Sequence, residues 1–137
     1  MEGINLLGVV LAVVAAAAIL TAYYLPQAMG LKWQQAVIAA TGQTAADLTG
    51  RIPIRMGAWL AVALVNAVVL AVLMRDLGHP DIFRGLFYGA LLWLGFGATF
   101  SLDAVIFANQ PILLWAINNG AYLLQLIAMG AIIGLIR

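Results

Sequence analysis

Asp103 is the residue of this sequence with the clearest potential for chemistry, because it is an acid within a long uncharged stretch. Residues 85–102 and 104–136 contain no Asp, Glu, Lys or Arg. A carboxylate at the centre of a membrane helix costs about 2.5–3.5 kcal/mol on insertion scales, and acids within membrane spans are often functional. There are two alternatives. Asp103 carries a proton or a cation, or it has a structural role in a hydrogen bond to a neighbouring helix or at the membrane interface.

A second set of polar residues recurs at helical spacing near the C-terminus. Asn118, Tyr122 and Gln125 are three or four residues apart, which places them on one helical face. A tight turn near residue 110 makes the helices on either side of it antiparallel neighbours. At matching depths the sequence therefore predicts a polar ladder that consists of Asp103, Thr99, Asn118, Asn119, Tyr122, Gln125 and Asn66.

The predicted ladder has two interpretations. In the first, its members form hydrogen bonds between helices and hold the bundle together, each bond contributing about 0.6 kcal/mol on average. In the second, they line a water-filled cavity that opens on the side of the long first loop. Beyond mid-depth the sequence offers mainly Gly, Ala, Leu and Met, so we expect no continuous open pore.

Residue counts exclude most other chemistry. The chain has no cysteine and a single histidine, His79, so thiolate sites and His-rich metal sites are impossible within one chain. His79 stands in a short turn beside Pro80 and Asp81, where we expect a solvated imidazole and an Asp81 helix cap. We expect no enzyme, no metal and no cofactor. A net charge of +1 offers no basic field for nucleic acid.

The elements that must position these residues are membrane helices. Hydrophobic residues make up 66% of the 137 residues and charged residues 8%, which is too few polar groups to cover a soluble domain. Uncharged runs long enough to cross a bilayer predict an all-α integral membrane fold, a four-helix bundle forming one domain over residues 1–137. The predicted spans are residues 4–25, 54–76, 83–107 and 112–136.

The first loop is longer than the other two. Residues 31–38 predict a short helix at the membrane interface that ends at Gly42, and Thr44 with Asp47 has the form of a capping box. Three Lys or Arg residues lie on each side of the predicted bundle, so the positive-inside rule does not assign its orientation. Both chain ends should lie on the same side.

Small residues predict where helices approach closely. Gly85 and Gly89 begin the third span, and Gly130 and Gly134 close the fourth, both at the spacing of close helix contacts in membranes. These glycines pack helices within one chain or join two chains.

Several short motifs resemble an uncharacterised bacterial membrane family, domain of unknown function 1761. They are Tyr23-Tyr24-x-Pro26, Met29-Gly30-x-x-Trp33, Thr41-Gly42-x-Thr44, Gly95-Phe96-x-Ala98-Thr99, Pro111, Leu114-Trp115-x-Ile117-Asn118-x-Gly120 and Met129-Gly130-Ala131-Ile132-x-Gly134. Ala121 and Tyr122 stand where the family pattern has a Tyr-His pair. The resemblance implies four membrane helices, a multi-pass protein of the bacterial inner (cell) membrane and no known activity.

The sequence predicts a non-enzymatic membrane protein, an accessory or binding subunit that packs through its glycine faces. The alternative is a small homo-oligomeric carrier or permease for a polar solute or proton that uses Asp103. A membrane enzyme is the third class, and no acid–base pair converges to support it. The expected partners are the lipid bilayer and either other membrane subunits or further copies of the chain.

Overall fold

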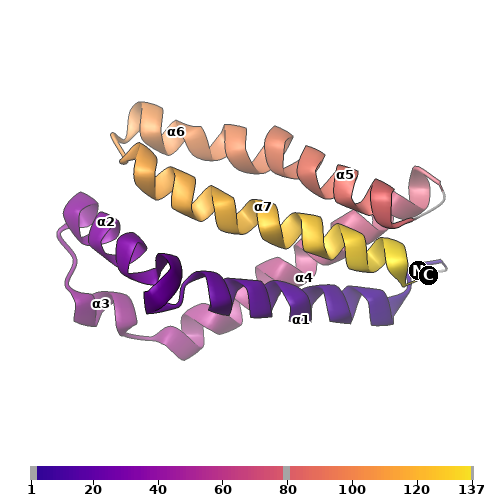
Figure 1. Ribbon diagram of the computed structural model, residues 1–137, viewed down its shortest axis with the longest axis horizontal. Coiled ribbons are helices and arrows are strands. Elements are labelled where there is room, and N and C mark those ends of the chain that lie inside the picture. The colour runs from indigo at the N-terminus through magenta and orange to yellow at the C-terminus, as the bar shows by residue number, and fades with distance from the viewer. Residues whose placement is uncertain (1–2, 79–80, 137) are drawn as a thin grey trace.

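The chain folds as an all-α bundle of four long helices, as predicted (Figure 1). This computed structural model describes residues 3–78 and 81–136. Four helices are long and apolar enough to cross a membrane, and they are called the first to fourth spans: Leu6–Tyr23, Ile52–Asp76, Ile82–Phe107 and Ile112–Leu135. Their bounds lie within two residues of the predicted spans.

The first span, α1 (Leu6–Tyr23), begins where the Asn5 side chain accepts hydrogen bonds from the amides of Leu7 and Gly8. Such a cap satisfies amides that have no partner within the helix. Beyond α1 the chain bends at Ala28, within the segment η1 (Pro26–Gly30).

A short helix is present where the sequence predicts one after the first span. It is α2 (Leu31–Thr41), and it ends at Gly42, whose φ of +69° favours glycine. The short helix α3 (Ala45–Thr49) follows. The side chains and amides of Thr44 and Asp47 bond reciprocally there, so the predicted capping box is confirmed.

The second span, α4 (Ile52–Asp76), starts directly after Arg51, whose φ is +59°. The third span consists of three parts, α5 (Ile82–Leu92), the π-helical segment η2 (Trp93–Ala98) and α6 (Thr99–Phe107). The last span is α7 (Ile112–Leu135), which begins after Pro111. The described residues near the two chain ends lie at one end of the bundle, opposite α2 and α3 (Figure 1).

The bundle is organised around α7, which packs mainly against α5 and α1. Where α1 meets α4, the contact is made by small residues, and Ala12, Ala16 and Ala67 have no exposed surface. Small side chains let helix backbones approach closely in a membrane. Larger buried residues, Leu70, Met74 and Met129, fill the core beside them.

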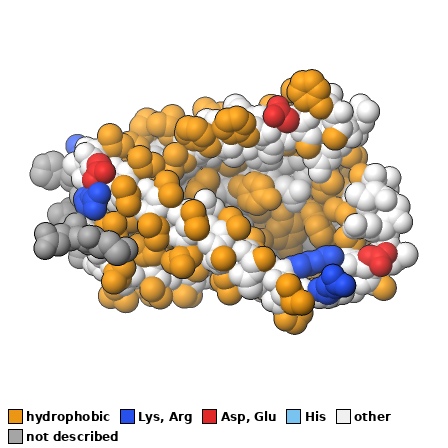
Figure 2. Space-filling view, turned by 180° about the vertical axis from the view of Figure 1, so that it is seen from behind, with side chains coloured by type: hydrophobic (Ala, Val, Ile, Leu, Met, Phe, Trp, Pro, Cys, Tyr) orange, Lys and Arg blue, Asp and Glu red, His pale blue; other side chains and the backbone are white. Residues whose placement is uncertain are grey.

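Many large hydrophobic side chains are exposed on the bundle, and Figure 2 shows them gathered on one of its faces. In the most apolar 18-residue stretch of each helix, 6% of the residues are buried in the third span, against 33% in the fourth. Aromatic side chains stand out from the third span, with Phe83 78% and Phe107 82% exposed. This surface requires lipid or another protein to cover it.

Candidate functional site

A network of polar groups joins the third span to α7 at the π-helical segment. The Ser101 hydroxyl donates to the Gly97 carbonyl at 2.7 Å. The same oxygen accepts from the Trp115 indole and from the Asn119 amide, each at 2.9 Å. Because a π-helical turn lengthens the hydrogen-bonding loop of the backbone, nearby carbonyls become available to such side chains.

Asn119 is the centre of this network and is only 2% exposed. Its side-chain amide also donates to the Trp115 carbonyl at 3.0 Å, and its own carbonyl accepts from the Trp93 indole at 3.0 Å. Two indoles and one carboxamide are thus bonded to groups of the same chain. These contacts agree with the first interpretation of the ladder, hydrogen bonding between helices.

A second polar cluster joins the end of α1 and the start of α2 to α7. The Tyr24 hydroxyl donates to the Asn118 side-chain oxygen, and the Tyr23 hydroxyl donates to the Ile117 carbonyl, each at 2.8 Å. The Tyr24 ring meets Trp33 edge to face, with 5.7 Å between ring centroids. Tyr24 and Trp33 therefore connect the first loop to the bundle.

The predicted ladder is only partly assembled. Asn119 lies at the depth of Ser101, which it meets because the tight turn makes the third span and α7 antiparallel neighbours. Thr99 and Asp103 instead lie exposed on the other side of α6, and the Thr99 hydroxyl bonds to the Gly95 carbonyl of its own helix. The prediction assumed a regular third helix. The π-helical turn accommodates about one extra residue, so it turns the residues after it back by about 100° relative to a regular α-helix.

The Asp103 side chain has no hydrogen bond or ion pair with any residue in the described ranges. It is exposed and stands apart from the network around Ser101 and Asn119. The expectation that it faces Asn118 and Asn119 is therefore wrong.

The predicted place of Asn66 in the ladder is also wrong. Asn66 is exposed, because α4 turns its alanine face, including Ala63 and Ala67, into the bundle. Gln125 is 6% exposed, and its side-chain nitrogen lacks a hydrogen-bond partner among the residues described. Tyr122, another ladder member, is 41% exposed.

The four glycines predicted to pack helices lie against helices of the same chain. Gly85 meets the carbonyl of Gly130, and Gly130 meets the carbonyl of Gly85. Gly89 lies against the Leu126 carbonyl, and Gly134 lies against that of Asp81. At each of these positions a Cβ atom would overlap backbone atoms, so the α5–α7 contact depends on glycine.

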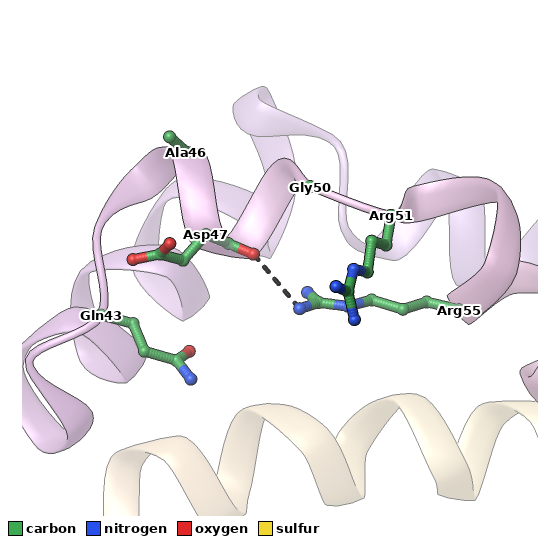
Figure 3. Close-up of a pocket in the computed structure, with 6 residues that line it drawn as sticks. All are labelled: Gln43, Ala46, Asp47, Gly50, Arg51 and Arg55. Carbon is green, nitrogen blue, oxygen red and sulfur yellow. Dashed lines mark hydrogen bonds between the residues drawn. The ribbon is translucent and has the colours of Figure 1, made fainter.

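A basic pocket of about 390 Å³ lies where the first loop enters α4 (Figure 3). The residues lining it are Gln43, Ala46, Asp47, Gly50, Arg51 and Arg55. Sequence reasoning missed this pocket and counted its arginines only toward orientation. The signal that could have found it is the i,i+4 spacing of Arg51 and Arg55 at the start of an apolar span.

Backbone carbonyls fix one of the two arginines. The Arg55 guanidinium donates to the Leu48 carbonyl at 2.8 Å and to the Asp47 carbonyl at 3.2 Å. The Asp47 carboxylate instead accepts from the amide and hydroxyl of Thr44, at 2.9 and 2.7 Å. These hydrogen bonds lower the pKa of Asp47 below its ordinary value, with a smaller effect from the Arg55 charge.

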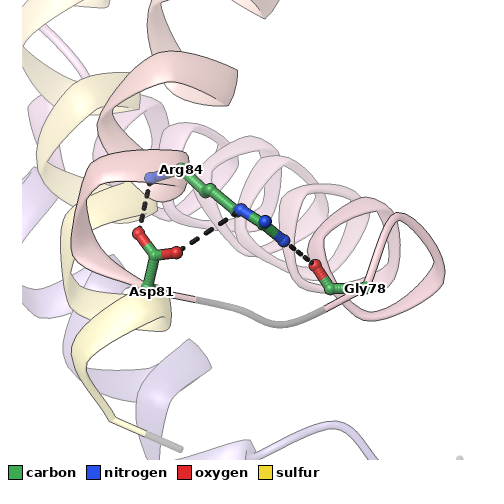
Figure 4. A network of polar contacts seen from close by, with 3 residues as sticks. All are labelled: Gly78, Asp81 and Arg84. Atoms are coloured by element: carbon green, nitrogen blue, oxygen red, sulfur yellow. Dashed lines mark hydrogen bonds and ion pairs between the residues drawn. The ribbon is translucent and has the colours of Figure 1, made fainter.

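At the opposite end of the bundle, Asp81 caps α5 as predicted (Figure 4). Its carboxylate accepts from the Arg84 amide at 2.9 Å, and the Arg84 guanidinium donates to the Gly78 carbonyl at 2.7 Å. The neighbouring His79, for which a solvated imidazole is expected, lies outside the described residues. Within those residues no three acidic or histidine side chains converge as metal ligands.

The fold and the polar contacts define a small four-helix membrane protein in which two clusters of polar groups are bonded between helices. The chain belongs to the family described as Protein of unknown function (DUF1761), whose model matches residues 7–134. This match confirms the resemblance seen in the sequence. No curated protein and no solved structure matches the chain.

Proposed function

We propose that the protein is a non-enzymatic accessory or binding subunit, a multi-pass protein of the bacterial inner membrane that associates with another membrane protein. The observation that carries this proposal is the position of Asn66. At 1.5 Å per residue, it lies about 21 Å from one end of α4 and about 15 Å from the other. It is exposed there and has no hydrogen bond to the described part of the chain.

A carboxamide at this depth is unfavourable against lipid. Polar residues within membrane spans generally face a bundle interior or a water-filled cavity, and Asn side chains bond across helices. A neighbouring protein that offers a donor or acceptor to Asn66 satisfies this requirement. Asp103, about 6 Å from the end of α6, adds a second exposed polar group for such a partner.

The sequence predicts that the glycine faces contact the partner, whereas in this proposal they pack helices within the chain. Gly85, Gly89, Gly130 and Gly134 are occupied by the contact of α5 with α7. They support the proposal indirectly, because they join α5 to α7 and leave the outward-facing side of this helix pair available to a partner. The partner contact is therefore assigned to the exposed polar positions of α4 and α6.

The carrier alternative has less support. It requires Asp103 to lead into a polar pathway, and Asp103 stands apart from the bonded cluster of Ser101, Trp115 and Asn119. That cluster consists of groups already satisfied by one another. A polar solute would find few free hydrogen-bonding groups there.

Site-specific photo-crosslinking in native membranes tests the proposal. A photoreactive residue at position 66 should give one protein adduct of defined mass, whereas the same residue at Leu64, which is 48% exposed on another side of α4, should react with lipid. Asn66→Leu should abolish stoichiometric copurification in mild detergent without unfolding the chain. Lipid adducts alone at position 66, together with solute or proton flux in proteoliposomes, would favour the carrier.

A further inference from the structure

The pocket at Arg51 and Arg55 carries positive charge that the chain does not neutralise. The one acidic residue lining it, Asp47, directs its carboxylate to Thr44. Neither arginine forms an ion pair with any carboxylate in the described ranges. Two guanidinium groups in one pocket repel each other, and an anion between them relieves that repulsion.

The pocket is built to hold an anion in place. Because two backbone carbonyls fix Arg55, little further ordering of its side chain is needed on binding. Both arginines and Gln43 line the same pocket, as Figure 3 shows. Guanidinium groups bind phosphate through paired hydrogen bonds, and a carboxamide supplies a further donor.

The depth of the pocket indicates where the anion comes from. Arg51 immediately precedes the α4 span, and Arg55 lies one turn inside it, the level at which lipid phosphates lie. Below Arg55 the same face of α4 continues with Trp59 and Val62, of which Val62 is 57% exposed. Figure 2 shows basic side chains at the edge of a hollow whose interior is hydrophobic.

We propose that Arg51 and Arg55 bind the phosphate of an anionic phospholipid, whose acyl chain runs along the apolar face of α4. The arginines recognise a phosphate group, and both a lipid headgroup and free inorganic phosphate offer one. The adjoining apolar face favours the lipid over the free ion. This site is separate from Asn66 and Asp103, so its test is independent of the proposed function.

The test is lipid binding by the full chain in neutral detergent, measured by native mass spectrometry. Phosphatidylglycerol should bind at defined stoichiometry and more tightly than zwitterionic phosphatidylcholine. Arg51→Gln is the cleanest variant, since the Arg51 side chain forms no hydrogen bond within the described residues. A basic residue near a membrane surface contributes about fivefold to binding, so Arg51→Gln should weaken phosphatidylglycerol binding roughly fivefold.

The matched control removes one positive charge at the other end of the bundle. Arg75→Gln, which loses only the exposed pair with Asp76, should leave phosphatidylglycerol binding unchanged. Equal weakening by both variants would overturn the proposal, because charge alone would then explain the binding. Equal affinity for the two lipids would also overturn it. Displacement of the lipid by inorganic phosphate at equal concentration would assign the site to the free ion.

Arg55→Lys serves as a second variant that keeps the charge. Lys lacks the planar fork that lets Arg55 contact both carbonyls and an anion. It should bind phosphatidylglycerol more weakly than the wild type while its circular dichroism stays unchanged. Wild-type lipid affinity in a folded Arg55→Lys variant would contradict the assigned geometry.

Discussion

Gly85 of α5 and Gly130 of α7 lie backbone against backbone, each facing the carbonyl of the other. No side chain separates the two helices at this point. Gly89 and Gly134 extend the contact in both directions, against Leu126 and Asp81. Helices α5 and α7 therefore make the close backbone contact that small residues permit between membrane helices.

Gly130→Ala should destabilise the chain, because even one methyl group would overlap the Gly85 carbonyl. Overpacking of this kind costs about 1–3 kcal/mol, and Gly130→Ile should cost more. The free energy of unfolding, measured by denaturant titration in mixed micelles, checks this. Gly57→Ala is the matched control, since a Cβ there meets nothing within 4 Å and alanine favours a helix. If both alanine variants kept wild-type stability, the contact would be looser than described.

Ser101→Ala should weaken the joint between the third span and α7. The hydroxyl is the acceptor for Trp115 and Asn119, and two bonds at about 0.6 kcal/mol each give a loss of about 1 kcal/mol. The Trp115 indole proton should also exchange faster with solvent, as nuclear magnetic resonance can measure. Thr99→Val is the control, because the Thr99 hydroxyl bonds only within its own helix. Equal losses from the two variants would count against an interhelical role for Ser101.

The sequence was sufficient to place the four spans, because uncharged runs and helix stops are local signals. Pro53, Asp81 and Pro111 mark helix starts in the structure as they do in the sequence. The depth of Ser101 relative to Asn119 was predictable for the same reason, since a tight turn fixes the level of the residues on either side of it.

The orientation of the third span was not predictable from periodicity. The π-helical segment Trp93–Ala98 leaves composition and length unchanged, yet it rotates the α6 residues relative to α5. Ser101 consequently points to α7, whereas Thr99 and Asp103 point away. The basic pocket was hidden for a related reason, because it depends on the left-handed backbone at Arg51 between two helices.

Acid should weaken the hydrogen bonds between Thr44 and the Asp47 carboxylate that cap α3, and so destabilise this helix. The bonds from Thr44 lower the folded-state pKa of Asp47 below the ordinary value of 3.8. The ionised carboxylate therefore stabilises α3 fully above that ordinary value, and this contribution is lost as pH falls through the lower, folded-state pKa. Amide exchange of residues 44–50, corrected for intrinsic rates, should rise between about pH 5 and about pH 2. Asp47→Asn should remove most of this pH dependence, and an unchanged profile in that variant would assign it to another group.

Asp103→Asn should leave the stability of the chain unchanged or raise it. Asp103 is exposed and forms no bond with the described residues, so the substitution removes a charge that is unfavourable near lipid and breaks no contact. Asn at position 103 still offers a donor and an acceptor, so it should also retain association with a partner that recognises hydrogen bonds.

The same variant separates the two functional alternatives. A partner that requires a carboxylate, for example through an Arg, would be lost from Asp103→Asn and kept by Asp103→Glu, with both chains folded. Proton or cation flux in proteoliposomes, present in the wild type and absent from Asp103→Asn, would instead establish the carrier. Wild-type copurification with Asp103→Asn, with no flux from either protein, would leave Asn66 as the contact that the partner requires. The Asn66→Leu and Asp103→Asn double variant should then behave as Asn66→Leu alone, because mutations at independent sites combine without coupling.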